Sequence, residues 1–284
     1  MSLRRRRLTE KCFKIATALI TWSSIAILGV LVFQILKEGM QWVDWQFITS
    51  LPSRKAEKAG IYTAIWGSFY LMITTMLFAL PTGIGAAIFL EEYGGKSRLS
   101  RFIDVNVANL AGVPSIVYGL LGLAVFVNLF GFGRSVISGG LTLGLLVLPV
   151  IIITTRGAIR SVPKSIPQAA YALGAKKWQV IFFHTLPYAL PGILTGVILS
   201  VSRAIGETAP LIIVGAAAYV AFVPESLLDE FTALPIQIFN WTSRPQEVFH
   251  SLSAGGIIIL LSVMLTMNSV AIFFRHKTQR SRNG

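Results

Sequence analysis

Residues 136–155 read VISGGLTLGLLVLPVIIITT, a run of 20 residues without a charged side chain. At 1.5 Å per residue, a helix of this length crosses the ~30 Å hydrocarbon core of a lipid bilayer. Comparable runs lie on both sides of it, at 15–36, 61–90, 105–130, 181–201 and 252–274. The sequence therefore predicts an all-α polytopic membrane protein with six transmembrane helices.

The composition supports a membrane protein and excludes several other classes. Of the 284 residues, 54% are hydrophobic and 13% are charged, and the mean hydropathy is +0.69. A soluble domain has about 25% charged residues, and a β-barrel would show short alternating strands. The composition thus argues against a soluble enzyme, and the single cysteine, Cys12, rules out an internal disulfide.

The positive charges alternate along the chain and predict its orientation. Of the 25 Lys and Arg residues, eighteen fall in 1–14, 91–101, 156–178 and 275–284, whereas six fall in 37–60, 131–135 and 223–251. Because basic loops stay in the cytoplasm, both termini are expected to be cytoplasmic. The chain then divides into a basic N-terminus (1–14), a transmembrane domain in the cell membrane (15–274) and a basic tail (275–284). The net charge of +13 then indicates orientation and contact with anionic lipid, not nucleic-acid binding.

Two further features concern the packing of the spans. The run 210–222 is too short to cross the membrane alone, so we interpret it as a re-entrant or half-helical segment. The pairs Gly140 with Gly144 and Gly192 with Gly196 have GxxxG spacing, which lets helix backbones approach closely in lipid.

No catalytic, nucleotide or metal motif is convincing. The GGKS sequence at 94–97 resembles the end of a phosphate-binding loop, but Leu90 stands where that motif requires glycine. His184, His250 and His276 fall in separate segments without ligand spacing. We therefore expect a non-catalytic chain that binds no cofactor or metal of its own.

The longest cytoplasmic loop, 156–178, contains a short helix pattern. Ser165 and Gln168 are spaced as a capping box, and Gly174 is a natural helix stop. The apolar positions between them form one face, namely Ile166, Ala169, Ala170 and Leu173. Spacing leaves two interpretations open, since this face suits either lipid headgroups or a groove on a soluble partner.

This loop resembles the EAA loop of ABC-importer permeases. The resemblance rests on Gln168, Ala169, Ala170 and Gly174, followed by Leu186 and Pro187. Gln168 replaces the usual Glu of that loop and His184 the usual Ile. The resemblance implies that the helix docks on an ATPase subunit, with Ser165, Gln168, Ala169, Ala170, Leu173 and Gly174 as docking residues.

Three other stretches are similar to the phosphate-importer permeases of the PstA type. They are LPTGIGAA (80–87), NLAGVPSIVYG (109–119) and RAIGETAPL (203–211). The resemblance implies a type I ABC importer permease that imports inorganic phosphate by alternating access. It also implies as partners a PstC-like permease, two PstB-like ATPase subunits that use the ATP, and an extracytoplasmic PstS-like phosphate-binding protein.

Arg203 and Glu207 are isolated charges within a long apolar region. A charge in hydrocarbon costs ~3 kcal/mol or more, so both should face water, the bundle interior or each other. At spacing i, i+4 they can form a self-satisfied pair. Alternatively, Arg203 offers a transient phosphate site that Glu207 regulates, because guanidinium binds oxyanions in a bidentate fork. Arg156 at the exit, and Asn106 and Asn109 along the path, are further candidates, and Arg156 can equally be an ordinary cytoplasmic charge.

Other functions remain possible from the residues alone. A permease for sulfate or molybdate would use the same arginine chemistry. A secondary transporter should show inverted repeats, and a membrane enzyme should show a nucleophile or metal constellation. We find neither pattern in the sequence.

Overall fold

The computed structural model describes residues 3–95, 97–217 and 219–280, and within them it consists of helices and connecting loops. Residues 1–2 and 281–284, the extremes of the expected basic termini, lie outside the described residues. The all-α class expected from the sequence is confirmed.

The helices follow one another along the chain with few long loops. The α-helices are α1 (Leu3–Gly39), α2 (Trp45–Thr49), α3 (Tyr62–Ile88), α4 (Arg98–Ala111), α5 (Ser115–Gly122), α6 (Val136–Arg160), α7 (Ser165–Ala172), α8 (Lys177–Val180), α9 (Leu186–Gly206), α10 (Ala209–Val214), α11 (Leu234–Thr242) and α12 (Glu247–Arg280). Three π-helical segments extend α3, α5 and α9, namely η3 (Phe89–Tyr93), η4 (Leu123–Leu129) and η5 (Ile181–Thr185). Two short 3-10 turns, η1 (Met40–Trp42) and η2 (Ala56–Lys58), lie between α1 and α3.

Five helical segments of the described chain are long and apolar enough to cross a membrane. They are Glu10–Trp42, Tyr62–Tyr93, Val136–Arg160, Lys177–Gly206 and Glu247–Phe273. The expected span at 105–130 is wrong as a continuous helix, because Arg98–Ala111 and Ser115–Leu129 meet at an angle of 110°. The break falls at Gly112–Pro114. Proline disfavours a helical conformation of the residue before it, and Pro114 itself is extended (ψ 140°) at the N-cap of α5. Counted as one broken span, the two pieces bring the number of candidate crossings in the described chain to six.

Helix α6, which contains the opening stretch of the sequence, lies at the centre of the bundle and is the most buried span. It packs on α3 through Gly140 and Gly144, which face Thr74 and Phe78. Two glycines of α9 also pack on α6. A Cβ at Gly192 would lie 2.7 Å from that of Ala158, and one at Gly196 would lie 2.0 Å from Thr154 Oγ1. The helix-packing interpretation of both glycine pairs is confirmed.

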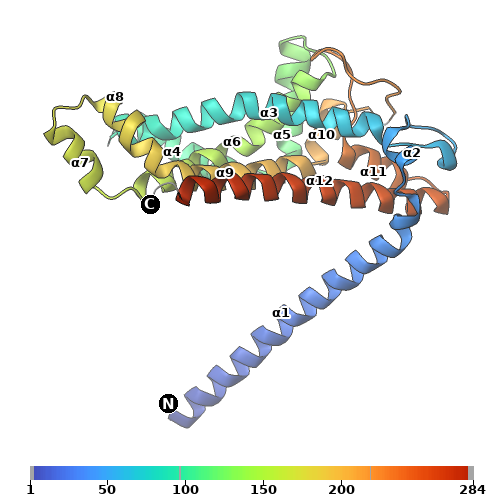
Figure 1. Ribbon diagram of the computed structural model, residues 1–284, viewed down its shortest axis with the longest axis horizontal. Helices are drawn as coiled ribbons and strands as arrows, with labels where there is room; N and C mark the ends of the chain where they lie inside the picture. Colours follow the sequence, from blue (N-terminus) through green and yellow to red (C-terminus); the bar gives the residue numbers. More distant parts are fainter. Residues whose placement is uncertain (1–2, 96, 218, 281–284) are drawn as a thin grey trace.

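The loops gather at the two ends of the bundle as the alternating charges predict. Figure 1 shows α7 and α8 beyond one end, and α2 and α11 at the other. The helix α12 ends, and α1 begins, on the side of α7 (Figure 1). The start of α1 and the end of α12 therefore lie on the same side as the 156–178 loop.

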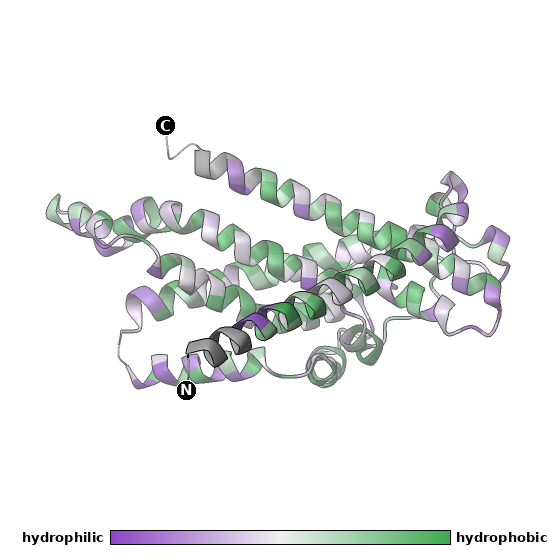
Figure 2. Ribbon diagram, turned by 90° about the horizontal axis from the view of Figure 1, so that it is seen from below, coloured by the Kyte–Doolittle hydropathy of each residue, from purple (hydrophilic) through white to green (hydrophobic). Residues whose placement is uncertain are grey.

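Helix α1 leaves the bundle at an angle and contacts it only near Gly39, which packs on Ala254 of α12 (Figure 1). Its apolar residues are exposed in the single chain, including Phe13, Trp22 and Phe33. Figure 2 shows hydrophobic (green) turns along much of α1. Such a surface requires lipid or another apolar helix around it.

The segment at 210–222 is only partly helical. Helix α10 covers Ala209–Val214 and ends at Gly215, whose φ of +103° lies in the left-handed region. The sequence did not suggest α11, which lies near α10 at the α2 end of the bundle, with Trp241 and Leu234 buried. Both short helices support longer ones without crossing the membrane themselves.

Replacing Gly196 by Ala tests the tight contact between α6 and α9. The new methyl group would collide with Thr154, and overpacking of this kind costs about 1–3 kcal/mol. We expect a lower midpoint of thermal unfolding for the detergent-solubilised protein. Gly85 is the matched control, since a Cβ there has nothing within 4 Å, and Gly85→Ala should leave the midpoint unchanged or raise it through helix propensity. Equal midpoints for the two variants would contradict this packing.

Candidate functional site

The three stretches 80–87, 109–119 and 203–211 converge on one core cluster in the middle of the bundle. Leu80, Ile84, Val113, Tyr118, Ala204 and Ile205 all contribute to it, together with Val147 and Ile151 of α6. Gly119 allows a close approach, since a Cβ there would lie 2.8 Å from Pro210 Cα and 2.9 Å from Ile213 Cβ. Helix α5 therefore rests directly on α10, and the broken span is held against the segment that follows Arg203.

Arg203 lies in the last turn of α9 and Glu207 caps that helix. Arg203 Nε lies 3.2 Å from Glu207 Oε1, so the expected ion pair is present. The side chain of Arg203 is 40% exposed and that of Glu207 is 16% exposed. Because Ala204 packs beside Val147 and Ile151, this charge pair lies level with the middle of α6. A guanidinium at this depth with only one Nε contact remains accessible to an anion.

Tyr118 spans the bend between α4 and α5. Its hydroxyl donates to the carbonyl of Leu110 at 2.8 Å, across the break, and its ring is buried. The ring packs in the same core cluster as Ala204, the residue after Arg203. Asn109 directly precedes Leu110 in α4, so the bend places its turn next to Tyr118. Tyr118 belongs to the stretch 109–119, but no role was predicted for it, because hydropathy does not reveal the bend that it spans.

Asn106 lies one turn before Asn109 on α4. Both side chains are exposed, and Asn106 Nδ2 donates to Phe102 O at 2.8 Å within the same helix. The structure thus brings Asn109, more than Asn106, towards the Arg203 region.

Arg156 lies away from Arg203, near the end of α6 that faces α7. Its Nε lies 3.3 Å from Glu91 Oε2, and its two Nη atoms bind both oxygens of Asp104, with Nη2 at 3.2 Å from Oδ2. Arg160 Nε lies 2.7 Å from Glu91 Oε1. We call these four residues the charge cluster. Glu91 and Asp104 were not predicted as site residues. Carboxylates near the ends of two spans, with an arginine at the end of a third, are the signal in the sequence that indicates them.

Helix α7 forms where the sequence predicts it, but its N-terminus differs from the expectation. The predicted capping box of Ser165 and Gln168 is wrong. Lys164 occupies the N-cap in a helical conformation (φ −58°, ψ −25°), and Ser165 is already the first helical residue. A capping side chain needs an extended N-cap, and here the turn begins earlier because Ile166 N donates to Pro163 O at 3.1 Å.

The apolar face of α7 is divided between the protein and the outside. Ala170 is buried and Ile166 packs on the ends of α6 and α9. The opposite side, with Ser165, Gln168 and Ala169, is exposed, and Leu173 beyond it is 90% exposed. An apolar side chain this exposed at the tip of a hairpin suits contact with another molecule.

Gly174 ends α7 as predicted. Its φ is +83°, Gly174 N donates to Tyr171 O at 2.9 Å, and Ala175 N donates to Ala170 O at 3.1 Å. This is the Schellman arrangement, in which a left-handed residue closes the helix and satisfies its last carbonyl groups.

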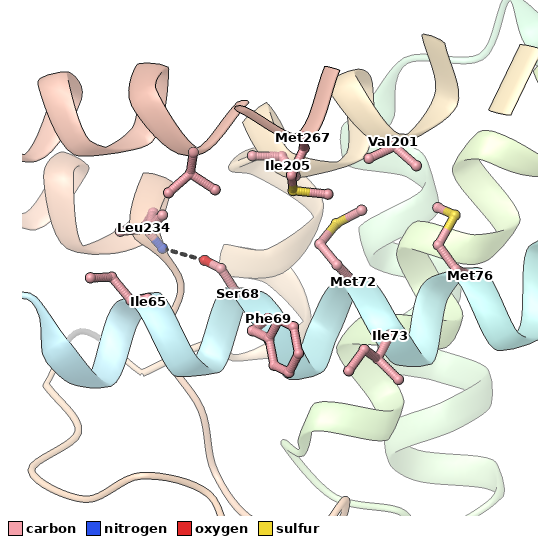
Figure 3. A pocket seen from close by; sticks show the side chains of 11 residues that line it. Ile65, Ser68, Phe69, Met72, Ile73, Met76, Val201, Ile205, Leu234 and Met267 are labelled. Atoms are coloured by element: carbon pink, nitrogen blue, oxygen red, sulfur yellow. Dashed lines mark hydrogen bonds between the residues drawn. The ribbon is translucent and has the colours of Figure 1, made fainter. Parts of the chain in front are cut away.

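A cavity of about 430 Å³ lies between α3, α9 and α12. Figure 3 shows Met72, Met76 and Met267 around it, and the hydroxyl of Ser68 accepting a hydrogen bond from Leu234 N at 2.8 Å. Because its lining is apolar and bears no charge, this cavity suits hydrocarbon and not an anion. The candidate site is therefore the region of Arg203 and not this cavity.

Residues 79–280 match the family described as binding-protein-dependent transport system inner membrane component. The chain is 33% identical to the probable ABC transporter permease protein YqgI of Bacillus subtilis, over 94% of this chain and 95% of that protein. It is 31% identical to the phosphate transport system permease protein PstA of Yersinia pestis, over 98% and 96% of the two chains. PstA 1 of Mycobacterium tuberculosis is likewise 31% identical, over 95% of this chain and 87% of that protein.

Solved structures of ABC transporters share the fold. A chain of a bacterial alginate ABC transporter, in complex with a periplasmic protein carrying an alginate pentasaccharide, superposes with a TM-score of 0.66 at 14% identity, over 95% of this chain and 94% of that one. A chain of the MetNI methionine ABC transporter in an inward-facing conformation gives 0.57 at 15% identity, over 77% and 94%. The chain thus has the fold of ABC importer permeases.

Replacing Gly174 by Val tests the termination of α7. A β-branched residue in the left-handed region costs about 1–2 kcal/mol or more, whereas Asn tolerates this conformation. We expect Gly174→Val to speed hydrogen exchange of the amides at 174–175 and of α7, and Gly174→Asn to change it far less. Indistinguishable exchange in the two variants would show that the positive φ is not required.

Proposed function

The chain belongs to the family of binding-protein-dependent transport inner membrane components, and we propose that it is the permease subunit of an ATP-driven importer of inorganic phosphate. Its relatives named as phosphate permeases align over nearly the whole chain. In this role the chain forms half of the translocation pathway.

The observation that carries this proposal is Arg203, a partly exposed guanidinium level with the middle of α6. A buried charge is expensive in a membrane and persists where it has a function or a partner. Glu207 occupies one nitrogen of Arg203, which keeps the side chain oriented between transport events. An incoming phosphate competes with this carboxylate for the guanidinium, because bidentate contacts to an oxyanion are stronger than a single one. Release then restores the pair.

The other candidate pathway residues have unequal support. Asn109 sits in the turn that Tyr118 ties to the Arg203 region, so it is the better placed of the two asparagines to donate a hydrogen bond to an oxyanion. Arg156 is neutralised by Glu91 and Asp104, which repel an anion. We therefore place the binding step at Arg203 and assign Arg156 a supporting role at the α7 end of the path.

The proposed energy source lies in partner subunits. Ser165, Gln168, Ala169 and Leu173 form the exposed side of α7 that would dock on a cytoplasmic ATPase, and Ala170 anchors the helix from within. Two PstB-like ATPases, a PstC-like permease and a PstS-like extracytoplasmic phosphate-binding protein would complete the importer. ATP would bind to the ATPases, and this chain would change between outward and inward openings without a catalytic residue of its own.

Substitution of Arg203 tests this proposal. Arg203→Gln removes the charge, and we expect ATP-dependent phosphate uptake by the assembled complex to fall at least about 100-fold, since charge-assisted contacts to an oxyanion are lost. Arg203→Lys keeps the charge but not the fork, and should retain measurable uptake with a raised KM. Co-purification of the partner subunits and thermal stability control for assembly. Wild-type uptake by an assembled Arg203→Gln complex would contradict an anion site at Arg203.

A further inference from the structure

Lys177 of the α7–α8 hairpin contacts η3, the π-helical end of α3. Lys177 Nζ donates to the carbonyl of Glu92 and lies 4.6 Å from the centre of the Tyr93 ring. Both partners belong to the π-helical turn η3. A cation held by a carbonyl and an aromatic face moves with them, so displacement of the hairpin pulls on η3.

Glu91 directly precedes Glu92 in the same turn, and its carboxylate joins η3 to α6. One carboxylate oxygen binds Arg160 at 2.7 Å and the other binds Arg156 at 3.3 Å. Its side chain is 19% exposed, so water screens these pairs less than it would on an open surface. A movement of η3 is thereby transmitted to the last turn of α6 through both oxygens.

Arg156 connects α6 to α4. Its two Nη atoms hold both carboxylate oxygens of Asp104, in the bidentate geometry that fixes direction as well as distance. Asp104 lies on the inner face of α4, between the buried Ser100 and Val107. Val107 packs with Leu90 and Ile152, so the charge pair and the apolar contacts hold α4 as one unit.

The far end of α4 reaches the candidate anion site. The carbonyl of Leu110 in its last turn accepts a hydrogen bond from the hydroxyl of Tyr118. The ring of Tyr118 packs in one core cluster with Ala204, the residue after Arg203. Gly112 and Pro114 lie between Leu110 and Tyr118, where the chain bends by 110°. At this short loop a rigid α4 can change its angle to α5. Side-chain contacts therefore run from Lys177 to the α4–α5 bend, which packs against the turn of α9 that carries Arg203.

We propose that Glu91 is a positioning residue for transport, and that the charge cluster transmits movement of the α7–α8 hairpin to the α4–α5 bend beside Arg203. The inference rests on the proposed function, since it assumes that an ATPase moves α7. Glu91 touches no substrate. It acts by keeping η3, α6 and α4 in register when the hairpin moves, so its loss separates ATP hydrolysis from phosphate movement.

The test compares Glu91→Gln with Glu92→Gln in the complete complex in proteoliposomes, with its phosphate-binding protein. Glu92 offers its backbone carbonyl to Lys177, and its carboxylate is in none of the charge-cluster pairs, so it is a matched neighbour. The readout is the coupling ratio, the phosphate taken up per ATP hydrolysed. We expect Glu91→Gln to lower the ratio at least about ten-fold while ATP hydrolysis stays within about two-fold of wild type, and Glu92→Gln to leave the ratio unchanged.

Lys177→Met is the second variant, because it lies in an exposed hairpin and should leave assembly intact even if Glu91→Gln does not. It should lower the same ratio. An unchanged ratio in an assembled Glu91→Gln complex, an equal loss in Glu92→Gln, or uptake and hydrolysis falling in proportion would each overturn the inference. If Glu91→Gln does not assemble, an unchanged ratio in Lys177→Met overturns it. Absence of phosphate uptake by the wild-type complex would instead refute the proposed function.

Discussion

Charge inside hydrocarbon is the constraint on which the rest of this structure depends. Arg203 and Glu207 lie where each unpaired charge would cost ~3 kcal/mol or more, and the chain meets this cost with an i, i+4 pair at 3.2 Å. The pair leaves two-fifths of the arginine side chain exposed. Complete burial would give a static ion pair, whereas this geometry gives a guanidinium that a second anion can reach.

The helices around the Arg203–Glu207 pair pack closely on one another. Glycines let α6 touch α3 and α9, and Gly119 lets the broken span rest on Pro210. In lipid, where burial of apolar surface drives helix association weakly, such close backbone contact is a main source of stability. The bend at Gly112–Pro114 then brings the turn of Asn109 and Tyr118 towards Arg203 instead of carrying the chain straight across.

Much of the architecture could be predicted from the sequence, because bilayer thickness and backbone chemistry act locally. Run lengths predicted five of the crossings, spacing predicted the Arg203–Glu207 pair, and glycine chemistry predicted the end of α7 at Gly174. The bend at 112–114 could not be predicted, since hydropathy is continuous across it. The capping box at Ser165 failed because Pro163 and Lys164 begin the turn earlier, and Glu91 and Asp104 acquire partners only when α3, α4 and α6 come together.

The most direct test of the central claim is transport by the wild-type complex in proteoliposomes that contain the partner subunits and the binding protein. Uptake of labelled phosphate is measured with and without ATP inside, and with excess sulfate as competitor. The account predicts ATP-dependent phosphate uptake that sulfate does not inhibit. Uptake that sulfate abolishes would assign the arginine site to another oxyanion, and uptake that requires an ion gradient in place of ATP would contradict the account.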